Sequence, residues 1–117
     1  MSEPIYTLKA EFFKTLGHPA RIRILELLAE REHSVTELMP ELGLESSHLS
    51  QQLAVLRKAG MVVARKQGNS VMYSIASRDI AELLLVARKV LTGLLTEQLG
   101  LLKDLQTNTS AAARAGR

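Results

Sequence analysis

The sequence predicts a mostly α-helical fold with a single β-hairpin. Apolar residues recur with helical spacing over most of the first 58 residues and again from residue 80 onward. Between these stretches, residues 61–75 change to a β pattern on either side of a turn that contains glycine and asparagine. The length of 117 residues, with 46% hydrophobic and 23% charged residues, suits one globular domain with one core.

Two short amphipathic helices are expected first. Residues 5–16 carry apolar side chains at helical spacing, and Gly17 is a natural place for this helix to end. Pro19 then stands where a first-turn proline is tolerated, and His18 before it is expected to act as a cap. The apolar stripe of the second helix consists of Ile22, Leu25, Leu28 and Ala29.

The next two helices are separated by the short turn of a helix-turn-helix. Residues 34–37 match a capping box, so a brief helix should begin there and end at Gly43. The following helix should open at Ser46 or Ser47, either of which can cap it, and Gly60 should end it. Its inward residues are expected to be Leu49, Leu53 and Leu56. Only residues 43–45 separate the two helices, which is helix-turn-helix spacing.

A hairpin and a long last helix complete the pattern. Residues 62–66 and 71–75 are the expected strands, and Ser77 can cap a helix that runs to about Leu105. The apolar face of this helix is wider than one neighbour would cover, so another chain is expected to pack there. We therefore predict a winged helix-turn-helix domain over residues 1–106. A flexible tail is expected over residues 107–117.

Charge and polarity point to DNA as the partner. Residues 46–78 contain five basic residues and no acidic residue. A helix that reads the major groove needs short polar side chains near its N-terminus, and basic residues nearby attract the phosphates. The expected DNA-binding residues are Ser46, Ser47, His48, Ser50, Gln51 and Gln52 on the helix, with Arg57, Lys58, Arg65 and Lys66 after them.

Each of these assignments has a plainer alternative. The polar cluster could be a solvated helix face that is rich in capping residues. Arg65 and Lys66 could instead protect an edge strand from aggregation by their charge. Asn69 fits turn chemistry better than base reading, and His33 is expected to be solvated in a polar loop.

Other classes of protein fit the sequence less well. There is no cysteine, which removes disulfides, thiolate metal sites and thiol nucleophiles, and the three histidines lie in separate segments. We therefore expect no enzyme, no cofactor and no metal. Charged residues interrupt the apolar run near the C-terminus, so no membrane span is expected and a cytoplasmic location is compatible. The main rival is a winged-helix module that binds proteins without sequence-specific DNA binding.

Two segments resemble the ArsR family of winged-helix repressors. They are Leu-Gly-His-Pro-Ala-Arg-Ile-Arg-Ile-Leu at residues 16–25 and Leu-Ser-Gln-Gln-Leu-Ala-Val-Leu-Arg-Lys-Ala-Gly-Met-Val at residues 49–62. The resemblance covers most of the chain, from about Leu8 to about Leu105. It implies a homodimer that contacts its partner through the first and last helices, represses an operator and releases it when an inducer binds. The interface residues implied are Leu8, Phe12, Leu84, Ala87, Leu91, Leu94, Leu95 and Leu102.

The chain departs from the metal-sensing members of that family. Their third helix carries cysteines, whereas residues 37–42 here read Glu-Leu-Met-Pro-Glu-Leu, and no histidine follows His48. The inducer therefore stays open. Three methionines and a tyrosine could line a responsive pocket but are more often plain core, namely Met39, Met61, Met72 and Tyr73.

Overall fold

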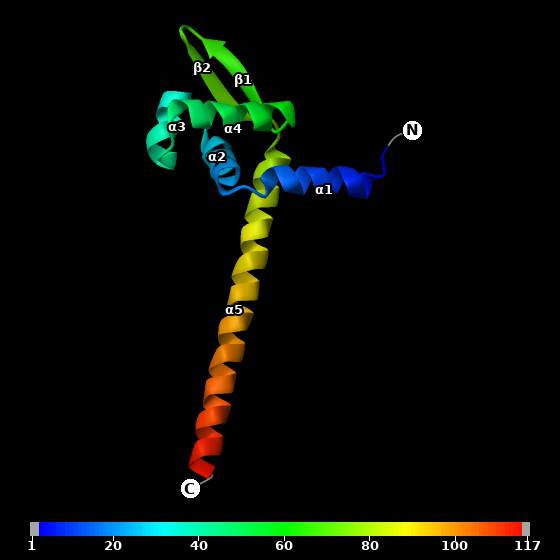
Figure 1. The fold of residues 1–117 in the computed structure, drawn as a ribbon, viewed down its shortest axis with the longest axis vertical. Coiled ribbons are helices and arrows are strands. Elements are labelled where there is room, and N and C mark those ends of the chain that lie inside the picture. The colour runs from blue at the N-terminus through cyan, green and yellow to red at the C-terminus, as the bar shows by residue number, and fades with distance from the viewer. Residues whose placement is uncertain (1–2, 116–117) are drawn as a thin grey trace. The chain divides into compact units, whose positions relative to one another are not determined.

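The computed structural model describes the backbone of residues 3–115 and the side chains of residues 3–107. Over these residues the element order is α1 (Ile5–Leu16), α2 (Pro19–Glu30), α3 (Val35–Leu42), α4 (Ser46–Lys58), β1 (Val62–Gln67), β2 (Ser70–Ile75) and α5 (Arg78–Ala115) (Figure 1). This order confirms the predicted winged helix-turn-helix. The chain divides into two compact units, a body that ends at Leu84 and the part of α5 from Leu85 onward.

The core of the body is aliphatic and is centred on α2. Its most deeply buried side chains are Ile24, Leu25, Leu38, Leu49, Leu53 and Leu56, each at most 1% exposed. The three inward leucines predicted for α4 are thus confirmed. In α2 the predicted stripe was too narrow, because Ile24 and Leu27 are also buried while Ile22 and Ala29 are only half-buried. The reason is that α2 packs against α1, α3, α4 and β2 at once.

The predicted capping box at the start of α3 is present. The Glu37 amide donates to the Ser34 hydroxyl at 3.2 Å, and the Ser34 amide donates to the Glu37 carboxylate at 3.0 Å. The bond from the Ser34 backbone lowers the pKa of Glu37, and a hydrogen bond from Arg31 lowers it further. Gly43 ends the helix with a φ of 64°, a left-handed conformation that favours glycine.

Side-chain capping was predicted wrongly at two other helices. His18 is the N-cap residue of α2, but its side chain makes no capping bond and its Nδ1 atom is buried without a partner among the described residues. Helix α4 begins one residue earlier than the capping argument assumed, with Glu45 as the N-cap and no side-chain cap. Ser46 and Ser47 therefore lie inside the first turn, where both are exposed.

The hairpin has a two-residue turn. Strand β1 pairs antiparallel with β2 from Val62 opposite Ile75 to Gln67 opposite Ser70, which leaves Gly68 and Asn69 as the loop. Gly68 has a φ of 62° and Asn69 has a negative φ, as in the type II′ turns that favour glycine at the first loop position. Each strand is one residue longer than predicted, at the loop end.

A third backbone segment pairs with the outer edge of β2. The His33 amide donates to the Tyr73 carbonyl at 3.1 Å, and the Tyr73 amide donates to the His33 carbonyl at 2.8 Å. The expectation that His33 is solvated is therefore wrong: this pairing draws the histidine inward, and it is 4% exposed. Its Nε2 atom lies 3.2 Å from the Leu27 carbonyl oxygen.

Helix α5 starts as predicted and continues further than predicted. The Ser77 hydroxyl accepts a hydrogen bond from the Asp79 amide at 3.1 Å, which caps the helix. The described backbone remains helical to Ala115, beyond the expected helix end near Leu105, and the flexible tail expected over residues 107–117 stays a prediction. The physical reason is the run of alanines near the C-terminus, since alanine has the highest helix propensity.

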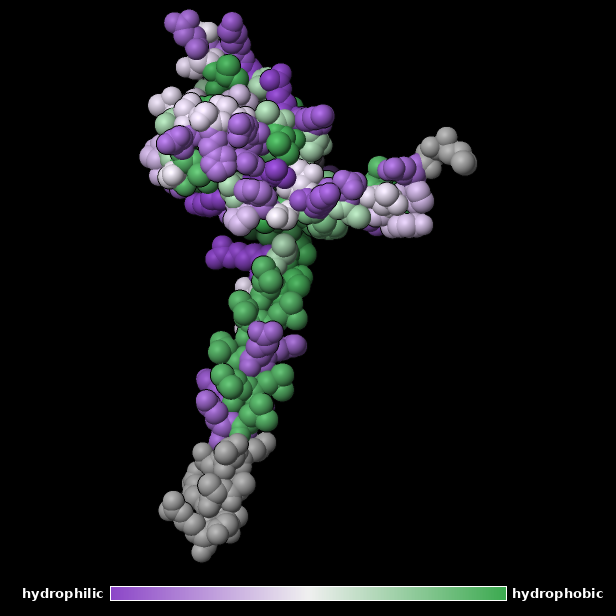
Figure 2. All heavy atoms as spheres, in the orientation of Figure 1, coloured by the Kyte–Doolittle hydropathy of each residue, from purple (hydrophilic) through white to green (hydrophobic). Residues whose placement is uncertain are grey.

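Much of α5 carries exposed apolar side chains. From Leu85 to Leu105 ten large hydrophobic residues are each at least 50% exposed, and Figure 2 shows them as green side chains along the helix. Charged and polar side chains lie between them. Among the described residues, no helix has both the length and the hydropathy that a membrane span needs.

Candidate nucleic-acid interface

The polar side chains at the start of α4 face solvent together. Five of the six residues predicted for this cluster are exposed, whereas Leu49, Leu53 and Leu56 fix the opposite side of the helix in the core. α3 packs against α4, as expected for a helix-turn-helix. The exposed five are Ser46, Ser47, His48, Ser50 and Gln51.

Gln52 does not belong to this exposed cluster. It is 8% exposed, and its side-chain oxygen accepts a hydrogen bond from Arg21 Nε at 2.8 Å. Arg21 also donates to the Thr15 carbonyl at 3.2 Å, so Gln52 is tied through it to the end of α1. The spacing contained the signal, because Gln52 follows Leu49 by three residues and so lies on the inward side of the helix.

The basic residues occupy two places. Arg57 and Lys58 are exposed in the last turn of α4, where cations complement the helix dipole. Arg65 and Lys66 are exposed on β1. Arg65 is not a free cation, because its guanidinium pairs with both carboxylate oxygens of Glu32, at 2.6 Å and 3.3 Å. Sequence reasoning missed Glu32, since it lies far from the hairpin along the chain.

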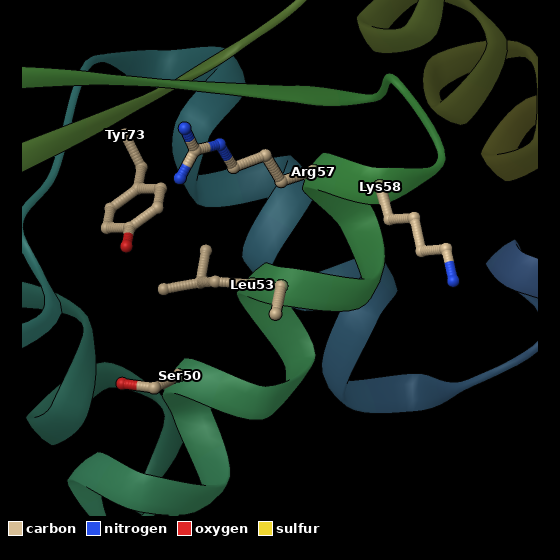
Figure 3. Close-up of a pocket in the computed structure, with 6 residues that line it drawn as sticks. Ser50, Leu53, Arg57, Lys58 and Tyr73 are labelled. Carbon is tan, nitrogen blue, oxygen red and sulfur yellow. The ribbon is translucent and has the colours of Figure 1, made fainter.

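A pocket of about 400 Å³ lies between α4 and β2. Its lining comprises Ser50, Leu53, Ala54, Arg57, Lys58 and Tyr73. In Figure 3 the Tyr73 ring reaches from β2 toward α4, and the Arg57 guanidinium lies beside it, while Lys58 points away. The sequence predicts Tyr73 only as a core residue or, with the methionines, as part of a responsive pocket. Of those methionines, Met61 is core and Met39 packs against it.

The residues expected at a dimer interface fall into two groups. Phe12 and Leu84 are half-buried against the core of their own chain. The other six, including Leu8, are exposed. The rings of Phe12 and Phe13 meet edge to face at 5.6 Å, and Phe13 is the outward one at 54% exposed. Of these two adjacent rings, Phe12 therefore faces the core and Phe13 is the one exposed to a partner.

The described residues contain no group of three or more histidine, cysteine, aspartate or glutamate side chains that could hold a metal ion.

A short turn separates α3 from α4, α4 exposes a row of polar residues, and a β-hairpin follows α4. This arrangement defines a winged helix-turn-helix protein. Residues 18–63 match the family model described as bacterial regulatory protein, arsR family. The chain is 65% identical over 111 residues to an uncharacterised HTH-type transcriptional regulator of Mycobacterium tuberculosis, Rv0081, covering 94% of this chain and 97% of that protein. It is 43% identical over 75 residues to the biofilm growth-associated repressor of Agrobacterium fabrum, covering 64% of each.

Solved structures of related proteins have a similar fold. The crystal structure of M. tuberculosis Rv0081 matches with a TM-score of 0.78 and 68% identity, over 84% of this chain and 99% of that chain. The homodimeric winged helix-turn-helix DNA-binding domain of Mb0332 from Mycobacterium bovis matches with a TM-score of 0.68 and 30% identity, over 79% of this chain and 88% of that chain. The chain belongs to the ArsR family of transcriptional regulators.

Proposed function

We propose that the protein is a homodimeric repressor that binds a palindromic DNA operator through α4. The observation that carries this proposal is the exposed polar row at the start of α4, held outward by three buried leucines. Serine, histidine and glutamine side chains can hydrogen-bond base edges and phosphates, and a single helix fits the major groove. Residues 46–78 contain no acidic residue, and although Glu32 pairs with Arg65, the side chains of Arg57, Lys58 and Lys66 are exposed cations that can attract the phosphates.

A dimer would place two copies of α4 for two half-sites. Exposed apolar side chains on α1 and α5 support a second copy as the partner, because a single chain leaves Leu8, Phe13 and Leu91 each more than half exposed. The Mb0332 relative is described as homodimeric. Two-fold symmetry would place the recognition helices in successive major grooves about 34 to 36 Å apart, which requires an imperfect palindrome. Sedimentation that detects only monomer at micromolar concentration would contradict this arrangement.

Repression of its own gene, with release by an unidentified signal, is the regulation that we propose. The biofilm growth-associated repressor among the relatives supports repression over activation. A role on DNA would also place the protein in the cytoplasm, without enzymatic activity.

Fluorescence anisotropy with the upstream DNA of the gene and a random duplex, each at two salt concentrations, tests this function. We expect tight, salt-sensitive binding that prefers the upstream DNA. Weak and equal binding to both duplexes would contradict autoregulation and favour a protein-interaction module.

Variants separate base reading from charge. Gln51→Ala and Ser47→Ala should each reduce the preference for the operator by about 1 to 3 kcal/mol, because each removes a base contact. Arg65→Ala should weaken all duplexes alike. Arg23→Ala is the matched control, since Arg23 is also a surface arginine paired with a glutamate, at 3.4 Å from Glu26, but on α2. If Gln51→Ala weakened operator and random DNA equally, the assignment of Gln51 would be wrong.

A further inference from the structure

The pocket between α4 and β2 has the chemistry of an anion site. Its floor is apolar, since Leu53 is 1% exposed, and its polar lining groups are the hydroxyls of Ser50 and Tyr73 and the cations of Arg57 and Lys58. No carboxylate lines it. Within the part of the chain that the structure describes, the side chains of Ser50, Arg57 and Tyr73 make no hydrogen bond, so their donors are available to a ligand. Three free donors, one of them charged, suit a phosphate oxygen.

The donors are held in place by the fold. Tyr73 stands opposite Ala64 in the hairpin, and on its other edge its backbone pairs with His33 through two hydrogen bonds of 3.1 and 2.8 Å. Its ring is therefore carried by the middle segment of a small three-segment sheet. Arg57 is anchored by the buried Leu53 and Leu56 in the same turns of α4. Figure 3 shows the Tyr73 hydroxyl directed toward the Ser50 end of α4, with the Arg57 guanidinium alongside the ring.

The position of the pocket identifies the phosphate. When a recognition helix lies in the major groove and a hairpin reaches the adjoining minor groove, the sugar-phosphate backbone that separates the two grooves must pass between helix and hairpin. The pocket opens between α4 and β2, where that backbone would pass.

We propose that each protomer binds one backbone phosphate of duplex DNA in this pocket. Arg57 supplies the charge, and the hydroxyls of Tyr73 and Ser50 donate hydrogen bonds to the phosphate oxygens. Tyr73 is thereby a DNA-positioning residue, and Ser50 serves the backbone rather than a base. This inference rests on the proposed binding of DNA through α4.

Tyr73→Phe is the first test, because it removes only the hydroxyl. We expect the variant to bind both the operator and a random duplex more weakly, by about tenfold per protomer and so about a hundredfold for the dimer, because each protomer loses one hydrogen bond to a charged group. The ratio between the two affinities should not change, because a phosphate contact carries no sequence information. Tyr6→Phe is the matched control, since Tyr6 on α1 is 73% exposed and outside the pocket. Thermal melts of both variants should match the wild type.

Arg57→Gln tests the charge. The slope of the logarithm of affinity against the logarithm of salt concentration should become shallower by about 0.9 per protomer, the value for one phosphate in duplex DNA. Lys58→Gln is the comparison, because Lys58 points away from Tyr73 (Figure 3). The effect of Lys58→Gln on DNA affinity should be the same in the wild-type and the Tyr73→Phe background. The effect of Arg57→Gln on DNA affinity should differ between these two backgrounds.

Single methylphosphonates, which neutralise one phosphate at a time, locate the contact. At one position in each half-site the methylphosphonate should lower the DNA affinity of the wild type. At that same position it should lower the affinity of Tyr73→Phe only slightly, because this variant already lacks the contact. If losses add at every position, or if Tyr73→Phe binds like the wild type, the pocket does not hold a backbone phosphate. Calorimetric binding of inorganic phosphate to the DNA-free protein, without such coupling, would assign the pocket to a free ion and overturn the DNA contact. If instead the wild type itself binds no duplex, the proposed function fails and this inference fails with it.

Discussion

Replacement of Gln52 tests whether this residue supports the fold or reads DNA. The residue is 8% exposed and accepts a 2.8 Å hydrogen bond from Arg21, whose other nitrogen bonds the Thr15 carbonyl. Gln52→Ala removes the carboxamide, which holds the acceptor, and one buried methylene group. It also leaves the half-buried Arg21 with one partner fewer.

The expected loss in the free energy of unfolding is about 2 to 3 kcal/mol. A hydrogen bond to a charged group contributes roughly 1.5 to 3 kcal/mol, and each buried methylene adds about 0.8 kcal/mol. Reorientation of Arg21 toward solvent offsets part of this sum, which is why the expected value lies below the total. For a domain of this size, a loss of about 2 to 3 kcal/mol lowers the melting temperature by roughly 10 to 20 °C.

Urea unfolding followed by circular dichroism, at one fixed protomer concentration, measures the effect. The fixed concentration matters because the stability of a dimer depends on it. Gln51→Ala is the control, since Gln51 is exposed and its loss should change stability by about 0.5 kcal/mol at most. Gln52→Glu, which keeps an acceptor for Arg21, should remain close to the wild type. A Gln52→Ala variant that unfolds like the wild type but loses operator preference would refute the structural role.

Three further predictions concern charge, acid and backbone conformation. Glu32→Gln should strengthen binding to operator and random duplex alike, by about fivefold or less at low salt, because it frees Arg65 from an exposed ion pair of modest energy. Anisotropy titrations measure both affinities, and a change only in the preference for the operator would contradict the prediction. The pKa of Glu37 is held below its ordinary value of 4.5 by the hydrogen bond from Ser34 and then by Arg31. The stability that it contributes is therefore complete above pH 4.5 and lost as the pH falls through the lower folded-state value, so the difference in unfolding free energy between wild type and Glu37→Gln should shrink in acid. Gly43→Ala should lower the free energy of unfolding by about 1 to 2 kcal/mol, because the φ of Gly43 is 64°. Gly93→Ala should raise the melting temperature, because Gly93 lies in helical backbone with open space around it. Equal effects of the two substitutions on thermal melts would exclude backbone conformation as the cause.

Local chemistry made the element order predictable. The capping box at Ser34, the glycines that follow α1, α3 and α4, and the β pattern after Met61 are signals that act within a few residues, and the fold keeps all of them. The strand ends shifted by only one residue, because the two-residue turn at Gly68 closes the hairpin as tightly as a type II′ turn allows. Binary patterning likewise identified the inward leucines of α4.

Contacts between distant segments could not be predicted in the same way. His33 looked like a loop residue because its neighbours are charged, but its backbone completes the edge of β2, forty residues further along the chain. Gln52 looked like part of a polar cluster because its partner, Arg21, lies on another helix. In both cases a polar side chain is buried because a partner from elsewhere satisfies part of its hydrogen bonding, and single-segment patterns carry no information about that partner.

The same reasoning changes how the charge of the binding surface should be counted. Along the sequence, residues 46–78 are purely basic, and this bias supported the DNA-binding hypothesis. In the folded chain Glu32 reaches the hairpin and pairs with Arg65, so one of the five cations is already partly neutralised. Arg57 has no such partner among the described residues and stands beside two free hydroxyls. The unpaired charge of the surface therefore lies nearer to α4 than the sequence count suggests, and contacts to DNA from the end of α4 should depend more strongly on salt than those of Arg65.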